Sequence, residues 1–377
     1  MKEKEPIKRV VVGLSGGVDS SVSAFLLKQQ GYEVIGLFMV NWDSVANQET
    51  NYLSDSNKKG CESQQDYLDA KKVAKKIGIP LYRVEFIKEY WDQVFVHFIN
   101  EYNSNRTPNP DILCNQFIKF DSFLNYAKKT FNCDYIAMGH YAQVSHTDDL
   151  SHLLKAVDEN KDQTYFLCNL SQEQLQQTLF PIGHLTKKEV RAIAQKNGLI
   201  TASKKDSTGI CFIGERNFRN FLANYIPNQP GDIVDIITNQ KVGQHNGTMY
   251  YTIGQRKGLN LGGMEQRYFV CQKDITNKII YVSPLSLQDQ YLMSTKAYIE
   301  NVNFIEPYNE YEPVDVRFRH RGELVKVTSF KIIKDDVLIT YQKSKSITPG
   351  QYAVFYQNHK CIGGGVIKAT NANNQKL

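Results

Sequence analysis

A glycine-rich segment near the start of the chain has the residue types that hold a phosphate group. Its two adjacent glycines let successive backbone N–H groups point inward as an anion nest, and an expected following helix adds its positive dipole end. Two serines offer hydroxyl donors to the same oxygens. The segment matches neither a Walker loop nor a Gly-x-Gly-x-x-Gly dinucleotide turn. Its residues are Gly13-Leu14-Ser15-Gly16-Gly17-Val18-Asp19-Ser20.

Asp19 is the unusual member of this cradle. A carboxylate there would repel phosphate unless a cation lies between them, which points to Mg²⁺-bound pyrophosphate. The alternative is an ordinary glycine-rich turn in which Asp19 caps the helix. The position directly after an apolar strand favours the phosphate cradle.

Cys114 is the first candidate nucleophile. Pro108 and Pro110 predict a stiff, non-helical loop, and a helical pattern begins just after Cys114. A thiol at a helix N-terminus has a stabilised thiolate, and the nearby Asp111 could move a proton or hold a base edge. The alternative, a half-buried structural cysteine with Asp111 in a turn, has about equal weight on the residues alone.

Cys211 lies among apolar residues with glycines on both sides, at Gly209 and Gly214. On chemistry alone this pattern favours a core cysteine. The chain has seven cysteines, an odd number without Cys-x-x-Cys or zinc spacing, which argues against a disulfide framework and a structural metal.

The elements that must position these residues alternate between strand and helix in the first half of the chain. This alternation predicts an α/β domain with a parallel, doubly wound sheet, whose ligands bind at the carboxyl ends of the strands. After about residue 205 glycine, proline and β-rich runs predict two smaller, mainly-β domains. The proposed domains are 1–208, 209–288 and 289–377. The expected strands are 9–14, 33–40, 81–86, 135–138, 233–238, 278–282, 325–330 and 352–355, and the expected helices are 20–30, 64–77, 88–102, 116–129 and one opened by the capping box 186–189.

The composition, 41% hydrophobic with a net charge of +6, is that of a folded protein with a modest preference for polyanions. No stretch approaches the ~20 apolar residues that span a membrane. The first nine residues resemble neither a signal nor a transit peptide, so a cytoplasmic location is expected. Arg317, Arg319 and Arg321 would share one face of a strand and could reach phosphate, or could protect an edge strand.

The sequence Ser-Gly-Gly-Val-Asp-Ser resembles the pyrophosphate loop of the N-type ATP pyrophosphatases, whose fold is the adenine nucleotide alpha-hydrolase-like one. That group adenylates carbonyl oxygens and releases pyrophosphate, and it includes amide-forming synthetases, lysidine-forming ligases and several thiolases.

Two further motifs, Asn109-Pro110-Asp111-Ile112-Leu113-Cys114-Asn115 and Ser207-Thr208-Gly209-Ile210-Cys211-Phe212-Ile213-Gly214, are similar to those of the tRNA-specific 2-thiouridylases. The likeness extends from about residue 8 to residue 368. Several separated motifs in the same order are far more specific than any one of them. The other matching segments are 38–42, 138–141, 161–167, 251–259 and 348–351.

This resemblance implies a tRNA-uridine 2-sulfurtransferase that uses ATP and Mg²⁺ to make 2-thiouridine at the wobble position of tRNAs for Lys, Glu and Gln. Cys211 would carry a persulfide supplied by a cysteine desulfurase or a sulfur-relay protein, Cys114 would be its partner, and the two would end as a disulfide. ATP would lie on residues 13–20, Met39 and Gly139. The implied tRNA contacts are Asn109, Pro110, Asp111, His140, Lys161, Asp162, Gln163, Arg317, Phe318 and Gln351.

Phe318 departs from the usual Arg-Tyr pair of the family, and the stretch before Gln351 is one residue longer than its pattern. Two rival functions use the same loop. An ATP-dependent amide or amidine synthetase would need no cysteines, and an RNA-binding protein with structural ATP would release no pyrophosphate. Both leave the two cysteine motifs unexplained.

Overall fold

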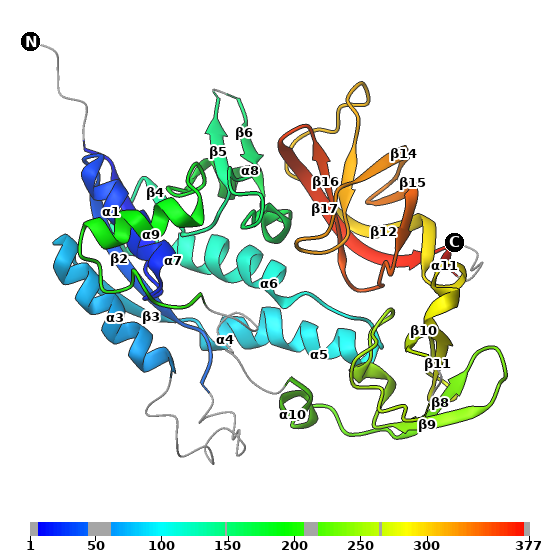
Figure 1. Cartoon of the computed structure of the whole chain (residues 1–377). Helices are drawn as coiled ribbons and strands as arrows, with labels where there is room; N and C mark the ends of the chain where they lie inside the picture. Colours follow the sequence, from blue (N-terminus) through cyan, green and yellow to red (C-terminus); the bar gives the residue numbers. More distant parts are fainter. Residues whose placement is uncertain (1–6, 44–61, 148, 207–217, 264–265, 373–377) are drawn as a thin grey trace, which may run out of the picture.

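The computed structural model of the protein describes residues 7–43, 62–147, 149–206, 218–263 and 266–372. Within these ranges the chain forms a parallel sheet covered by helices, then a four-stranded sheet and a closed barrel (Figure 1). The predicted fold class, an α/β domain with a doubly wound sheet followed by two smaller mainly-β domains, is confirmed.

The parallel sheet has the strand order β3-β2-β1-β4-β7. Its central strand is buried on both faces, because Val10, Val11 and Val12 have no exposed surface. Such continuous apolar runs are typical of parallel strands that are covered on both sides. The strands are β1 Arg9–Gly13, β2 Glu33–Val40, β3 Leu81–Glu85, β4 Tyr135–Ala137 and β7 Thr178–Leu179.

Helices cover both faces of this sheet. Val10 and Val12 pack toward α1 Val18–Gln29 and α3 Glu62–Ile77, and α9 Lys187–Lys196 lies beside α1. Val11 belongs to the hydrophobic cluster on the other face. The chain there runs through α4 Ile87–Tyr90, the π-helical η1 Trp91–Phe95, α5 Val96–Asn103, α6 Pro110–Leu113, the π-helical η2 Cys114–Ser122 and α7 Phe123–Phe131.

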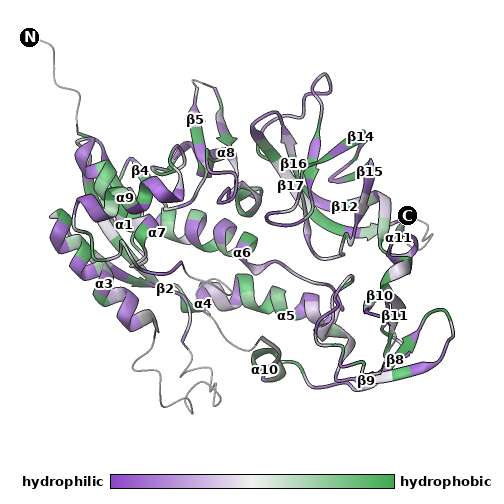
Figure 2. Ribbon diagram, in the orientation of Figure 1, coloured by the Kyte–Doolittle hydropathy of each residue, from purple (hydrophilic) through white to green (hydrophobic). Residues whose placement is uncertain are grey.

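The polar face of α3 is exposed to water. Polar and hydrophobic residues alternate along this helix (Figure 2), with Ala70 and Val73 buried and Lys71, Lys72 and Lys75 exposed. Among the described helices, none is long and apolar enough to cross a membrane.

The helix that carries Cys114 starts earlier than predicted. It begins at Pro110, so Cys114 lies one turn inside it rather than at its N-terminus. The prediction of a non-helical loop through Pro110 was wrong because proline is well suited to the first helical position, where no N–H is needed. The N–H of Cys114 donates within the helix, so it is not one of the unpaired end groups that would stabilise a thiolate.

The central sheet has the order β10-β11-β8-β9, and β8 Gly231–Asp235 runs parallel to β11 Ile279–Pro284. β9 Lys241–His245 and β10 Tyr268–Asp274 are antiparallel to their neighbours. The helix α10 Phe218–Ala223 precedes this sheet, and α11 Gln288–Tyr291 leads from it to the barrel.

The C-terminal barrel has six strands and closes through pairing of its first and last strands, β12 and β17. A hairpin of β5 Gln143–His146 and β6 Ser151–Leu154, from the first half of the chain, extends the same sheet by pairing β6 with β17. The limits 1–208, 209–288 and 289–377 remain a proposal, since residues 207–217 lie outside the described ranges. The barrel strands are β12 Met293–Phe304, β13 Asp315–Arg317, β14 Val325–Ile333, β15 Asp336–Lys345, β16 Tyr352–Gln357 and β17 Lys360–Thr370.

Candidate active site

The glycine-rich segment connects the carboxyl end of β1 to α1, as predicted. Helix α1 begins at Val18 with Gly17 as its N-cap, so Asp19 lies in the first turn and is not the cap. The hydroxyls of Ser15 and Ser20 are 3.1 Å apart, and the Ser20 hydroxyl donates to the Gly17 carbonyl. These bonds fix the loop in a tight turn at the positive end of the helix dipole.

Gly16 and Gly139 are required by close packing around this loop. Gly16 has φ +78°, and a Cβ there would lie 2.2 Å from the Asp66 carbonyl oxygen of α3. Gly139 follows β4, and a Cβ on it would lie 2.8 Å from the Ser20 backbone nitrogen. Any side chain at either position would displace the loop.

Met39, at the end of β2, lies close to the first residue of the loop. A Cβ on Gly13 would be 3.7 Å from the Met39 methyl group and 2.6 Å from the Met138 sulfur. The residues predicted to hold ATP therefore come together from β1, β2 and β4 at the carboxyl edge of the sheet, where this fold class binds its ligands.

The Asp19 carboxylate is engaged by two other side chains. The Lys187 ammonium lies 2.7 Å and 2.8 Å from its two oxygens, and the Tyr141 hydroxyl donates to it at 2.8 Å. Among the residues that the structure describes, no group of three or more His, Cys, Asp or Glu side chains could hold a metal ion. Both carboxylate oxygens of Asp19 are engaged by Lys187 or Tyr141, so the described residues do not form a resident Mg²⁺ site here. Magnesium at Asp19 stays a prediction.

Lys187 joins the glycine-rich loop to the segment that precedes Cys211. Its ammonium also lies 2.8 Å from the Asp206 carboxylate. Asp206 forms two further ion pairs, with Lys161 at 2.7 Å and with Arg191 at 2.9 Å. Burial raises the pKa of Asp206, but the hydrogen bonds from Lys161 and Lys187 outweigh this and lower the pKa to about 2. Asp206 is therefore ionised at neutral pH.

Lys204 ties the same segment to the loop from the other side. Its ammonium donates to the Gly16 carbonyl at 3.0 Å and pairs with Asp66 and Asp69 of α3 at 2.7 Å and 2.6 Å. These ion pairs hold Lys204 and Asp206 beside the glycine-rich loop in this structure. Residues 207–209 and Cys211 lie outside the described residues.

Sequence reasoning missed Lys187, Lys204, Asp206 and Tyr141. One signal for Lys187 was available. It occupies the first position of α9, directly after the Thr186 cap, where the helix dipole disfavours a cation. A lysine at such a position indicates a nearby carboxylate or anion.

Cys114 is fully buried in the large hydrophobic cluster that also contains Met138. Since Met138 contacts the Gly13 position, this cluster extends from the glycine-rich loop to the cysteine-bearing helix. Asp111 lies in the first turn of the same helix and is partly exposed. The side chain of Asn109 hydrogen bonds to Tyr165.

His140 is a buried histidine beside Phe120 and Phe180, at ring distances of 5.8 Å and 6.0 Å. Its Nδ1 atom has no hydrogen-bond partner in the described part of the chain. Burial and the positive charge of Lys119 lower the pKa of His140 well below 6.5. The ring is therefore neutral at pH 7.

This burial predicts a pH-dependent stability. Below about pH 6.5 the unfolded chain protonates His140 and the folded protein does not, so acid favours unfolding. Between pH 7.5 and 5.5 the free energy of unfolding should fall by about 1.4 kcal/mol less in His140→Gln than in the wild type. Urea titrations at both pH values measure this difference. The control is His184→Gln, because His184 is exposed. If the free energy of unfolding fell equally in the His140 and His184 variants between about pH 7.5 and 5.5, the prediction would be contradicted.

Several residues expected to contact tRNA are used inside the protein. The buried carboxylate of Asp162 accepts from Arg317 of the barrel at 2.7 Å, and Phe318 is buried in the barrel core. Lys161 is paired with Asp206, and the side-chain oxygen of Gln163 accepts from the Tyr141 backbone. Contact of these side chains with tRNA stays a prediction.

The basic cluster after β13 is not a strand. β13 ends at Arg317, and Arg319 and Arg321 are exposed in a turn where Arg321 has φ +59°. The expectation that the three arginines share one strand face was wrong, because that left-handed residue interrupts the extended chain. Positive charge is also exposed by Arg256 and Lys257 beside a hollow of about 1140 Å³ in the central domain.

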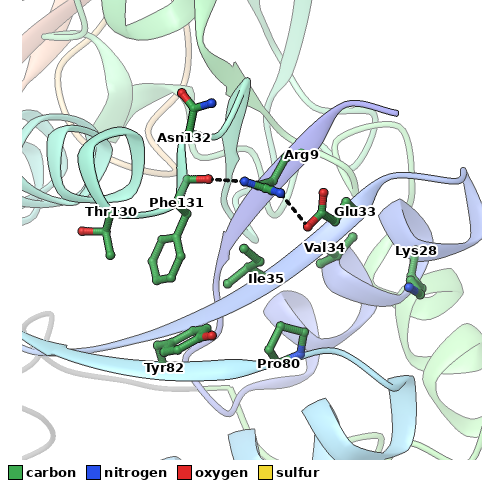
Figure 3. A pocket seen from close by; sticks show the side chains of 10 residues that line it. All are labelled: Arg9, Lys28, Glu33, Val34, Ile35, Pro80, Tyr82, Thr130, Phe131 and Asn132. Carbon is green, nitrogen blue, oxygen red and sulfur yellow. Dashed lines mark hydrogen bonds and ion pairs between the residues drawn. The ribbon is translucent and has the colours of Figure 1, made fainter. Parts of the chain in front are cut away.

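Another cavity, of about 450 Å³, lies at the opposite edge of the parallel sheet. Figure 3 shows the Arg9 guanidinium there. It donates a hydrogen bond to the Phe131 carbonyl at 2.6 Å and forms an ion pair with Glu33 at 3.0 Å. This edge holds the amino ends of β1 and β2, so the cavity is distinct from the glycine-rich loop.

Comparison with known proteins decides the family. The tRNA-specific 2-thiouridylase MnmA of Ureaplasma urealyticum serovar 10 is 73% identical over 98% of both chains. The chain belongs to the tRNA-specific 2-thiouridylase family. The Mesoplasma florum member is 56% identical over 96% of this chain and 98% of its own.

Three domain families match in the order of the fold. They are described as tRNA methyl transferase HUP domain over residues 8–215, tRNA methyl transferase PRC-barrel domain over 219–284 and aminomethyltransferase beta-barrel domain over 294–367. Among solved structures, a 4-thiouridine synthetase–RNA complex with bound ATP aligns over 56% of this chain and 47% of its own. Its TM-score of 0.32 and identity of 13% are too low to carry an argument.

Proposed function

We propose that this protein catalyses ATP-dependent 2-thiolation of the wobble uridine in tRNAs for Lys, Glu and Gln. The observation that carries the proposal is the convergence of residues 13–20, Met39 and Gly139 at one sheet edge, in contact with the cluster that contains Cys114. A phosphate cradle and a cysteine on one scaffold suit activation of an oxygen followed by its replacement with sulfur. The family's 2-thiouridylase members support the same reaction.

The first step makes the C2 oxygen of uridine a leaving group. That oxygen attacks the α-phosphorus of ATP, which forms the adenylated base and releases pyrophosphate. The loop N–H groups and the dipole of α1 stabilise the phosphates. Asn109 and Asp111 would hold the base, with His140 beside it, after the uridine has left the anticodon stack.

The second step transfers sulfur from a persulfide on Cys211. Either the terminal sulfur attacks C2 and expels AMP, after which Cys114 attacks the Cys211 sulfur and releases the thiolated base, or Cys114 attacks first and releases hydrosulfide, which then displaces AMP. Both routes leave a Cys114–Cys211 disulfide, which a thiol reductant must reduce by two electrons. A disulfide requires the two Cα atoms within roughly 7 Å.

We further propose a cytoplasmic location, with tRNA as substrate and a cysteine desulfurase or relay protein as persulfide donor. Residues Lys161, Asp162, Gln163, Arg317, Phe318 and Gln351 remain the proposed tRNA-side residues. The side chains of Asp162, Arg317 and Phe318 make contacts inside the protein. These three residues would therefore affect tRNA binding indirectly, by shaping the surface between the first domain and the barrel.

The decisive experiment follows labelled sulfur into unmodified tRNA in the presence of ATP, Mg²⁺, cysteine and a cysteine desulfurase. Label should enter tRNA only with ATP and the wild-type protein, and Cys211→Ser should reduce incorporation by about a thousandfold or more. Pyrophosphate release without sulfur transfer, even with relay proteins supplied, would instead support the synthetase alternative. Binding of tRNA without pyrophosphate release would support the RNA-binding alternative.

A further inference from the structure

Residues 105–109, which lead into the helix of Asp111 and Cys114, are held from two sides by the two β domains. In Figure 1 the chain between α5 and α6 runs toward the barrel and the central sheet. The residues that hold this segment lie more than 140 positions away in the sequence.

The barrel holds the segment through the turn before β16. The Thr107 backbone N–H donates to the Pro349 carbonyl at 3.1 Å. The Gln351 side-chain amide donates to the carbonyls of Thr107 at 2.7 Å and Pro108 at 3.2 Å. Between them Gly350 has φ +90°, and a Cβ there would lie 2.7 Å from the Thr107 nitrogen.

The central domain holds the same segment from its other side. The ammonium of the partly buried Lys273 donates to the carbonyls of Asn105 at 2.6 Å and Tyr251 at 3.0 Å. Burial lowers the pKa of Lys273 to about 8. The Thr248 hydroxyl donates to the Asn105 side chain, and the hydroxyls of Thr252 and Thr107 are 3.4 Å apart.

The position of the segment determines where the helix begins. Asn109 is the N-cap residue and Pro110 is the first helical residue, so residues 105–108 end directly at the proposed base-binding residues. Since an α-helix is stiff, a shift of its first residue also moves Cys114.

We propose that Lys273 and Gln351 are positioning residues, which use the two β domains to hold residues 105–108 and so place Asn109, Asp111 and Cys114 for reaction. The inference rests on the proposed function for its effect on catalysis. It also gives Gln351 a role that differs from direct contact with tRNA, because its amide already donates to the loop.

The test compares Gly350→Ala with Gly31→Ala in the full-length protein. Both glycines have φ +90°, so both alanines strain the backbone alike, but nothing lies within 4 Å of a Cβ at Gly31. Because a misplacement of about 1 Å can cost about 100-fold in rate, Gly350→Ala should lower kcat for thiolation by about 10- to 100-fold. Its KM for ATP should be unchanged, and Gly31→Ala should keep the wild-type kcat. Equal kcat values for the two variants would overturn the proposal.

A second variant tests the contact without backbone strain. Gln351→Glu replaces the donating amide by oxygens that face two carbonyls, whereas the exposed Gln342→Glu adds the same charge elsewhere on the barrel. Only Gln351→Glu should lower kcat, and an equal effect of both substitutions would count against positioning.

Amide hydrogen exchange separates this inference from the proposed function. Exchange of the Thr107 amide should accelerate in Gly350→Ala and Gln351→Glu but not in the two controls, whether or not the protein thiolates tRNA. If the wild type transferred no sulfur while this difference in amide exchange persisted, the proposed function would fail. The proposal that the two β domains hold residues 105–108 would still stand. Unchanged exchange of the Thr107 amide in all four variants would contradict the proposal that these contacts hold residues 105–108.

Discussion

Thiolation of tRNA is expected to fall by about a thousandfold or more when Cys114 is replaced by serine. Both proposed routes need the Cys114 sulfur to attack a sulfur of Cys211, and a serine hydroxyl is neither ionised at neutral pH nor able to form a disulfide. Adenylation needs no thiol, so pyrophosphate release dependent on tRNA should persist for at least one turnover. Labelled sulfur and labelled pyrophosphate, followed in the same reaction, measure the two steps separately.

Cys271→Ser is the matched control for this substitution. Cys271 is also buried, in the central sheet, and its thiol donates to the Tyr281 carbonyl, which a serine hydroxyl can do as well. The control should thiolate tRNA at nearly the wild-type rate. Sulfur incorporation by Cys114→Ser at that same rate would exclude Cys114 from the chemistry.

Replacing Lys187 by methionine is expected to slow adenylation by about 100- to 1000-fold. The ammonium offsets the Asp19 carboxylate in the first turn of α1, and without it a negative charge would face the incoming phosphates. Methionine keeps most of the apolar stem. The pyrophosphate-release rate with saturating tRNA measures the effect, and the KM for ATP should rise with it.

The same substitution should destabilise the protein by about 1–3 kcal/mol, below the value for a fully buried pair because Asp19 is 31% exposed. The exposed neighbour Lys188→Met is the control and should change neither quantity. Adding Asp19→Asn to Lys187→Met should recover part of the stability, because the uncompensated carboxylate is removed. A normal adenylation rate in Lys187→Met would show that the Lys187 charge is dispensable.

Local patterns explain why much of the fold was predictable from sequence. The apolar run of β1, the glycine turn and the capping box at Thr186 each depend on neighbouring residues alone, and each is present in the structure. Met39 and Gly139 were assigned to the same site only through the family resemblance, and their position beside residues 13–20 agrees with parallel strands that place their carboxyl ends together.

Contacts between distant residues were not predictable in this way. Nothing near Asp162 indicates that its carboxylate is buried against Arg317 of the barrel. Nothing in the sequence around Lys204 and Asp206 indicates their partners, and only the tertiary structure shows the acidic and basic side chains that pair with them. The helix start at Pro110 was misplaced because two prolines and an aspartate suit both a loop and a first helical turn.

The pairing of β6 with β17 has a consequence for how the protein is made. The hairpin and Asp162 emerge from the ribosome long before β17 and Arg317. Until then the edge of β6 is unpaired, and the Asp162 carboxylate has hydrogen bonds from Ala156 and Thr164 but no cationic partner. Such late, non-local contacts slow folding and delay the final stability until the barrel closes. A chain truncated before the barrel would therefore keep the parallel sheet and its own hydrophobic clusters but lack the partners of β6 and Asp162.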